Sequence, residues 1–146
     1  MAKEWHFVVP IQPMATPRPS FRYDQKNNRA VTYYDDRYMG YMAEVQKLLK
    51  EQDLLNNRFY EIMASELGVR AEVYFYLKVP KGQKKINNIM RTSAPDIDNL
   101  LKAILDSIFK GLSIKDSRIV MVQTAKFQVL DNPRTEITLR SVDDGN

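Results

Sequence analysis

Residues 95–116 read PDIDNLLKAILDSIFKGLSIKD, and this stretch is the most informative part of the chain for both fold and site. After the first residues, apolar side chains recur every three or four positions, which is the spacing of an amphipathic helix. Gly111 stands where such a helix commonly ends. The stretch therefore predicts a helix over Ile97–Lys110 that packs one apolar face against a core.

Three carboxylates flank the predicted helix. Asp96 and Asp98 lie two residues apart at its start, and Asp116 follows it after a turn. A cluster of negative charges is costly unless a cation shares it, so a divalent-metal site is the first hypothesis. Each carboxylate also has an ordinary alternative role. Asp96 can cap the helix, Asp98 can pair with Lys102 one turn later, and Asp116 can brace a turn.

The composition limits the kind of metal. The chain has no cysteine and one histidine, His6, which excludes disulfides and multi-histidine or thiolate zinc sites within one chain. Oxygen ligands favour Mg²⁺, Mn²⁺ or Ca²⁺ instead. If the strand after Asp116 packs beside a strand at Val69–Val79, the three carboxylates can converge on one or two Mg²⁺ ions, as in nucleases. Lys102 can then neutralise charge on a phosphate.

A basic segment leads directly into the acidic pair. No acidic residue occurs from Val73 to Pro95, although five lysine and arginine side chains fall inside that range. The whole chain carries a formal net charge of +4. A basic segment beside a metal site indicates a polyanionic substrate, and an ordinary solvated loop is the alternative.

The remaining pattern predicts an α+β (mixed α/β) fold that spans residues 1–146 as a single compact domain. We expect a mixed sheet of about four strands, packed against two main helices. Residues 69–79 alternate apolar and polar side chains most clearly. The other expected elements are a strand at Trp5–Ile11, a loop at Met14–Arg29, a short strand at Ala30–Tyr34, a helix from Asp35 or Asp36 to Gln52, a helical piece ending near Leu67, and a closing hairpin of Ile119–Val129 with Thr135–Val142.

Residues 96–106 also resemble a known family. They contain the pattern Asp-x-Asp-Asn-x-x-Lys-x-x-x-Asp, and Asp116 follows just ahead of a predicted strand. This arrangement resembles the RusA family of Holliday junction resolvases. The N-terminal segment Thr16-Pro17-Arg18-Pro19, followed by an aromatic residue, is similar to the phage and prophage branch of that family.

The resemblance implies a homodimeric, Mg²⁺-dependent endodeoxyribonuclease, with Mn²⁺ as a substitute, that cuts four-way DNA junctions by paired symmetric nicks. It implies that Asp96, Asp98 and Asp116 bind the metal and that Lys102 is catalytic. Lys115 stands where some relatives carry an acidic residue, which leaves the number of metals open. Asn99 and Asp106 are expected to support the site, and the expected DNA contacts are Arg18, Arg22, Lys81, Lys84, Lys85 and Arg91.

Two other functions remain open at the level of sequence. The same site can serve a nuclease that acts on flaps or replication forks, and a chain with a decayed site can serve as a non-catalytic junction-binding module. The chain begins without a visible signal peptide and has no apolar run of membrane-spanning length. We therefore expect a protein of the bacterial cytosol, encoded by the host or by a phage or prophage.

Overall fold

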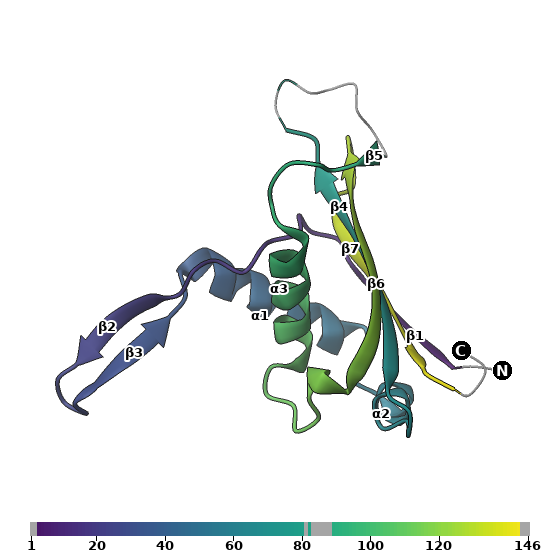
Figure 1. The fold of residues 1–146 in the computed structure, drawn as a ribbon, viewed down its shortest axis with the longest axis horizontal. Helices are drawn as coiled ribbons and strands as arrows, with labels where there is room; N and C mark the ends of the chain where they lie inside the picture. Colours follow the sequence, from purple (N-terminus) through teal and green to yellow (C-terminus); the bar gives the residue numbers. More distant parts are fainter. Residues whose placement is uncertain (1–2, 81, 83–88, 144–146) are drawn as a thin grey trace.

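The computed structural model describes residues 3–80, 82 and 89–143. A five-stranded mixed sheet carries helices on one face, and a two-stranded hairpin projects away from this body (Figure 1). The expected fold class is confirmed, with one strand more in the main sheet than expected. In spatial order the main sheet contains β1 (Glu4–Val9), β7 (Arg134–Ser141), β4 (Val69–Lys78), β6 (Ile119–Val129) and β5 (Ile89–Met90).

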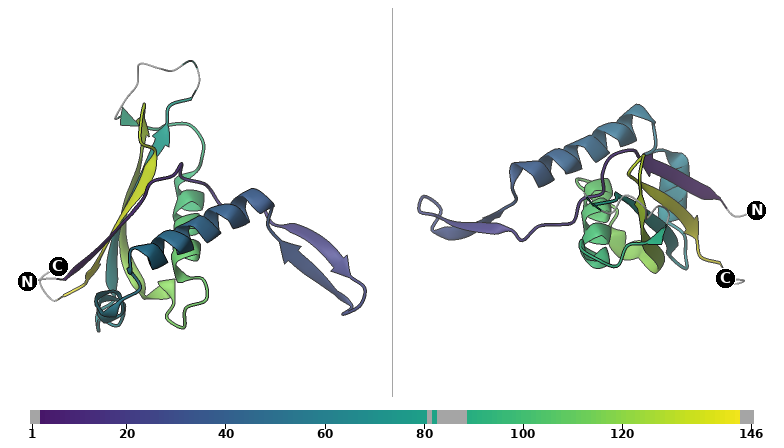
Figure 2. Two further views of the ribbon diagram at one scale, coloured as in Figure 1. Left: turned by 180° about the vertical axis from the view of Figure 1, so that it is seen from behind. Right: turned by 90° about the horizontal axis from the view of Figure 1, so that it is seen from above.

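The helices begin where short polar side chains can cap them. Asp35 accepts a hydrogen bond of 2.9 Å from the backbone N–H of Tyr38, and Asn56 does the same for Phe59 at 3.0 Å. The two long helices pack against each other on the same face of the sheet (Figure 2). The helices are α1 (Asp36–Glu51), α2 (Asn57–Met63) and α3 (Ile97–Phe109), and a 3₁₀ turn, η1 (Asp116–Arg118), follows α3.

The core lies between the sheet and these helices. Every second residue of β4 is buried from Val69 to Leu77, as the alternation in the sequence predicts. Leu100, Ile104 and Ile108 of α3 are fully buried against that face. Burial of one such side chain stabilises the folded state by about 1.5–3 kcal/mol. These three side chains therefore hold α3 against the centre of the sheet.

The predicted closing hairpin is wrong, because β4 lies between β6 and β7. β6 pairs with β4 in parallel, and β7 pairs antiparallel with β4 on its other side and with β1. A helix that packs on β4 returns the chain beside β4 in the same direction, which is the usual β–α–β crossover. Thr135, Ile137 and Leu139 are buried, so β7 fits the interior of the sheet and not its edge.

The projecting hairpin, called the arm here, consists of β2 (Ser20–Asp24) and β3 (Arg29–Tyr33). The sequence predicted a loop where β2 lies, because none of the five β2 residues is buried and no alternation marks a core-facing side. The views of Figures 1 and 2 show the arm extending beyond the N-terminal end of α1. Phe21 and Tyr23 are exposed on it.

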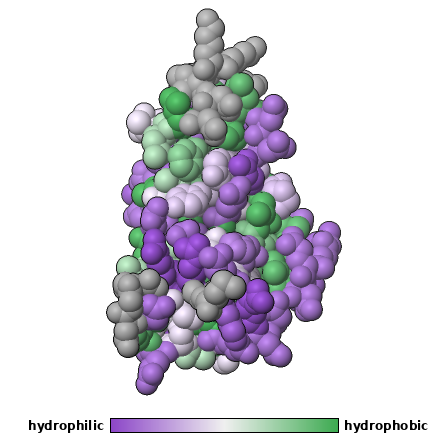
Figure 3. Space-filling view, turned by 90° about the vertical axis from the view of Figure 1, so that its right-hand side faces the viewer, coloured by the Kyte–Doolittle hydropathy of each residue, from purple (hydrophilic) through white to green (hydrophobic). Residues whose placement is uncertain are grey.

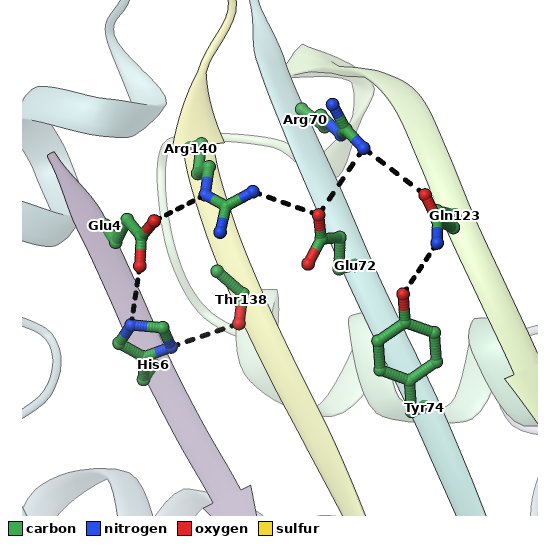
Figure 4. A network of polar contacts seen from close by, with 8 residues as sticks. All are labelled: Glu4, His6, Arg70, Glu72, Tyr74, Gln123, Thr138 and Arg140. Atoms are coloured by element: carbon green, nitrogen blue, oxygen red, sulfur yellow. Dashed lines mark hydrogen bonds and ion pairs between the residues drawn. The ribbon is translucent and has the colours of Figure 1, made fainter. Parts of the chain in front are cut away.

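The other face of the sheet carries no helix among the described residues. It is largely hydrophilic in the space-filling view (Figure 3). Arg140 donates to Glu4 at 2.8 Å and to Glu72 at 3.0 Å, and so links three neighbouring strands (Figure 4). The network continues through Arg70 to Gln123 on β6. The charges of this network are balanced in sign, with Glu4 and Glu72 against Arg70 and Arg140.

Candidate nuclease site at the ends of helix α3

Asp96 occupies the N-cap position of α3 but does not use its carboxylate as a cap. Its backbone carbonyl accepts the first helical hydrogen bond, from the N–H of Leu100 at 3.1 Å. Within the described residues, its side chain makes no capping hydrogen bond, unlike Asp35 and Asn56 at the other helices. The exposed carboxylate is therefore left for another partner, and the simple capping explanation does not apply.

Asp98 lies in the first turn of α3, where the helix dipole favours a negative charge. Its Oδ1 accepts a hydrogen bond of 3.0 Å from the backbone N–H of Asn99, which limits the rotation of the carboxylate. The side chain is exposed, like that of Asp96. Two carboxylates with oxygen atoms open to solvent thus stand together at the positive end of one helix.

Two basic residues hold the segment that leads into this helix. The ammonium of Lys126, on β6, donates to the carbonyl oxygens of Ser93 at 2.7 Å and Pro95 at 2.6 Å. The guanidinium of Arg91 donates twice to the carbonyl of Ala94, at 2.8 and 3.1 Å. Sequence reasoning missed Lys126, although the lone cation within the strand 119–129 was a signal. Arg91, an expected DNA contact, uses guanidinium N–H groups to hold the loop before α3.

Lys102 pairs with Asp106 and not with Asp98 in the described part of the chain. Its Nζ lies 2.9 Å from Oδ2 of Asp106, one turn further along α3. The hydrogen bond and the charge of Asp106 raise the pKa of Lys102 above its ordinary value. Lys102 is therefore positively charged at neutral pH, which suits stabilisation of an anion and not proton abstraction.

Asp116 lies near the opposite end of α3. Figure 1 shows α3 running from the β5 end of the sheet to the end where β6 begins. From Asp98 to Phe109 the helix rises by about 16 Å, and Asp116 then begins η1 beyond the turn. Arg118 holds η1 in place, since its guanidinium donates to the carbonyls of Met63 and Ser65 at the end of α2.

The three expected metal ligands therefore do not gather within one chain. No group of three or more Asp, Glu, His or Cys side chains in residues 3–80, 82 and 89–143 is arranged to hold a metal ion. β6 does pack beside β4, which was the condition for the three carboxylates to converge. Because β6 runs parallel to β4, however, Asp116 lies at the far end of α3. Asp96 and Asp98 fit a hard cation as a pair of oxygen donors; a single chain does not add Asp116 to them.

The expected DNA contacts fall into three groups. Arg18 and Arg22 are exposed on or beside the arm, and the guanidinium of Arg22 lies 5.9 Å from the centre of the Tyr33 ring. Arg91 is tied to backbone carbonyls, as described above. Lys81, Lys84 and Lys85 lie outside the described residues.

Comparison with known proteins decides the family. The family model of endodeoxyribonuclease RusA matches residues 10–140, which is most of the chain. The chain belongs to the RusA family of endodeoxyribonucleases. The match begins just after β1 and includes β2 through β6, all of β7 except Ser141, and every residue of the candidate site. No curated protein matches the chain significantly. Among the described residues, no helix has the length and apolar character needed to cross a membrane.

Membership in the RusA family implies an endodeoxyribonuclease that acts on branched DNA of the Holliday-junction type. The resemblance seen in residues 96–106 is thereby confirmed at the level of the family. The roles of Asp96, Asp98, Lys102 and Asp116 stay predictions, as do the metal and the number of chains in the active assembly.

Proposed function

We propose that this RusA-family chain is a Mg²⁺-dependent endonuclease that resolves Holliday junctions by paired, symmetric nicks. The observation that carries the proposal is the exposed pair Asp96 and Asp98 at the start of α3, within the region matched to the family. Lys102, one turn after Asp98 on α3, provides a positive charge on the same helix, where it pairs with Asp106.

The two carboxylates of Asp96 and Asp98 are suitable ligands for Mg²⁺. Mg²⁺ is commonly held by one or two carboxylates and keeps its remaining positions for water and phosphate oxygens, and Mn²⁺ accepts the same ligands. When bound, such an ion activates a water for attack on the phosphodiester and stabilises the leaving oxygen. In this proposal Asp96 and Asp98 supply oxygen ligands, and the helix start that carries them is fixed by Lys126.

Lys102 acts as a fixed positive charge in this proposal. The bond to Asp106 keeps the ammonium protonated and limits its motion. A protonated ammonium beside the reacting phosphate stabilises the negative charge that develops on it. Asp106 then works through Lys102, which agrees with the supporting role expected for it.

We infer that the active protein is a homodimer and that β6 is its contact edge. In the described part of the chain, β5 pairs only with Phe127 and Gln128, so most of the outer edge of β6 has no strand partner. Val120, Met121 and Val122 follow one another there and are 59%, 42% and 44% exposed. An open edge with three exposed apolar side chains is suited to pairing with a second copy.

A two-fold pairing of this edge also accounts for the separation of the carboxylates. In an antiparallel pair of β6 strands centred on Met121, Asp116 of one copy approaches Lys126 of the other. Lys126 is bonded to the residues just before Asp96. The proposed dimer therefore brings Asp116 of the second copy toward the Asp96–Asp98 pair, and it forms two equivalent sites related by the two-fold axis.

The arm supports the proposed DNA substrate. Arg18, Arg22 and Arg29 lie on or near it together with exposed aromatic rings. Arginine contacts phosphates, and aromatic rings accept unstacked bases, so such a surface fits a distorted branch point. Binding through phosphates predicts a steep loss of affinity as salt rises.

The deciding experiment compares cleavage of a synthetic four-way junction, a replication fork, a flap and a linear duplex at one salt concentration. We expect paired nicks in the junction with Mg²⁺, no nicks with a chelator, and no nicks with the Asp98→Asn variant. Preferred cutting of forks or flaps supports the alternative nuclease, and binding without Mg²⁺-dependent cutting supports a non-catalytic module. Wild-type cleavage by Asp98→Asn contradicts the role given to Asp98.

A further inference from the structure

A hollow of about 680 Å³ lies on the helix layer, at the base of the arm. It is formed where the end of β3, the start of α1, the end of α3 and the turn before η1 meet. Asp116 forms part of its wall. The open edge of β6 belongs to the sheet layer, whereas this hollow lies between α1, α3 and the arm. Its volume is in the range that binds small organic groups.

The lining of the hollow suits a flat, mostly apolar group. Met42 and Phe109 are nearly buried at its base, whereas Met39 and Tyr33 remain 40% and 48% exposed. Methionine and tyrosine side chains pack well on the faces of aromatic rings. A lining of this kind leaves apolar surface in contact with water until a planar group covers it.

The charges at the rim suit an anionic chain attached to that group. Lys110 and Lys115 both border the hollow. Of the two acidic side chains there, Asp106 is already paired with Lys102 at 2.9 Å. Lys115, the residue before Asp116 in the chain, thus supplies a positive charge at the rim.

We propose that this hollow receives a single unstacked nucleobase of the branched DNA, next to the strand that is cut. The proposal rests on the proposed function, since that function supplies the DNA. A base that leaves its stack exposes two apolar faces, which Met39 and Tyr33 can cover. Its flanking phosphates then lie within reach of the rim lysines. The hollow is next to Asp116, so an inserted base belongs to a nucleotide close to the reacting phosphate.

A branch point is the place where this insertion costs least. Extruding a base from an intact duplex requires loss of pairing and stacking, and the cost falls where pairing is already interrupted. The hollow therefore adds little to the affinity for linear duplex. For a junction it adds one favourable contact beside each cut. The hollow in this way contributes to the preference for branched DNA and to the choice of the cutting position.

The test uses the Met39→Trp variant, which fills the hollow with a larger side chain. Val8→Trp is the matched control, because Val8 is comparably exposed on β1, which does not border the hollow. Binding to a four-way junction is measured in a chelator, so that no cutting occurs. A set of junctions each lacks one base near the cutting position, and in parallel 2-aminopurine replaces single bases there to report unstacking.

We expect Met39→Trp to weaken binding of the intact junction by about five- to hundredfold, the usual contribution of one stacked base. On the junction that lacks the inserted base, Met39→Trp and wild type should bind equally. At that same position 2-aminopurine emission should change on binding of wild type and Val8→Trp, but not of Met39→Trp. Tyr33→Ala, at an exposed position of the arm, is a second variant that should behave like Met39→Trp.

The proposal is overturned if both variants bind intact junctions as wild type does, or if they weaken all junctions equally at every position. It is also overturned if Met39→Trp changes the sedimentation behaviour of the free protein, because the hollow would then belong to a contact between copies. In these cases Mg²⁺-dependent junction cutting by wild type leaves the proposed function intact. A wild-type protein that neither binds nor cuts junctions overturns both.

Discussion

The ammonium of Lys126 lies 2.6 Å from the carbonyl oxygen of Pro95, which joins β6 to the entry of α3. A second bond of 2.7 Å to the carbonyl of Ser93 fixes the same segment. Asp96 is the next residue after Pro95, so the direction of its carboxylate depends on a lysine that is distant in sequence. Lys126 is thus a positioning residue for the proposed metal site.

Replacing Lys126 with methionine should reduce junction cutting much more than junction binding. The change removes two hydrogen bonds from a charged donor, which together contribute about 1–3 kcal/mol, and frees the entry of α3. Cutting and binding are measured separately, over a series of Mg²⁺ concentrations. Lys50→Met removes the same charge from an exposed site at the end of α1 and serves as the control. Equal cutting by both variants contradicts this prediction.

Mixing two inactive variants tests whether the site is shared between copies. Asp98→Asn and Asp116→Asn should each abolish cutting alone. If Asp116 of one copy completes the site of the other, a mixed dimer keeps one intact site, and random exchange restores roughly a quarter of the wild-type sites. The recovered activity should be single nicks and not paired cuts, as read on labelled junction strands.

No recovery in the mixture, with exchange of subunits verified, would place all three residues in one chain. The β6 edge is tested in the same series by Val122→Lys, which adds a charge to that edge. We expect this variant to sediment as a monomer and to lose cutting. The distant Val8→Lys change on β1 is the control for the added charge.

The charge of Lys102 should not titrate in the neutral range. Asp106 raises the pKa of Lys102 above its usual 10.5, so the ammonium stays protonated until the pH exceeds that value. Titration of Lys102 should therefore add no pH dependence to cutting between about pH 6 and 9. Lys102→Met should abolish cutting, and Lys102→Arg should retain part of it at every pH in that range. A need for the neutral amine would appear instead as activity rising steadily toward high pH.

The same pair makes a small, pH-dependent contribution to stability. Because the pKa of Lys102 is higher in the folded protein, the contribution is fully present below about pH 10.5 and is lost as the pH rises through the folded value. The side chains of Lys102 and Asp106 are 54% and 35% exposed, so solvent screens the pair and it contributes only about 0.3–0.5 kcal/mol. Denaturant unfolding of Asp106→Asn should show a loss of this size at pH 8 that disappears as the pH rises through the pKa of Lys102 in the folded protein.

Gly68→Ala should destabilise the protein by about 1–3 kcal/mol and disturb the start of β6. Gly68 has a φ of +97°, and an added Cβ would lie 2.8 Å from a methyl carbon of Val120 and 3.2 Å from the carbonyl oxygen of Arg118. Both neighbours adjoin Asp116 or the proposed contact edge, so cutting should fall as well.

Gly40→Ala is the matched control, because Gly40 lies within α1 and an added Cβ meets no atom within 4 Å. That change should stabilise the helix by about 0.5–1 kcal/mol. Thermal unfolding of the two variants gives the comparison. A stable, fully active Gly68→Ala protein would contradict the close approach of Val120.

The local elements of this protein follow from local sequence patterns. The alternation over Val69–Val79 predicted β4 to within one residue, the helical spacing predicted α3 equally closely, and Asp35 was identified as a possible start of α1. Each of these signals lies within a single helix or strand. Secondary-structure propensity and burial of one side of an element can therefore be recognised in a short stretch of sequence. β2 was missed because its exposed residues bear no such signal, and β5 because it has only two residues.

The pattern from Asp96 to Asp116 was enough to indicate the candidate carboxylates, Lys102 and the family, but not the role of Lys126. How these residues are distributed in space depends on the packing of the elements. The crossover from β4 through α3 makes β6 parallel to β4, and a parallel strand must begin where the helix ends. Asp116 is therefore separated from Asp96 and Asp98 by the length of α3, because strand direction depends on contacts between elements and not on any single stretch of sequence.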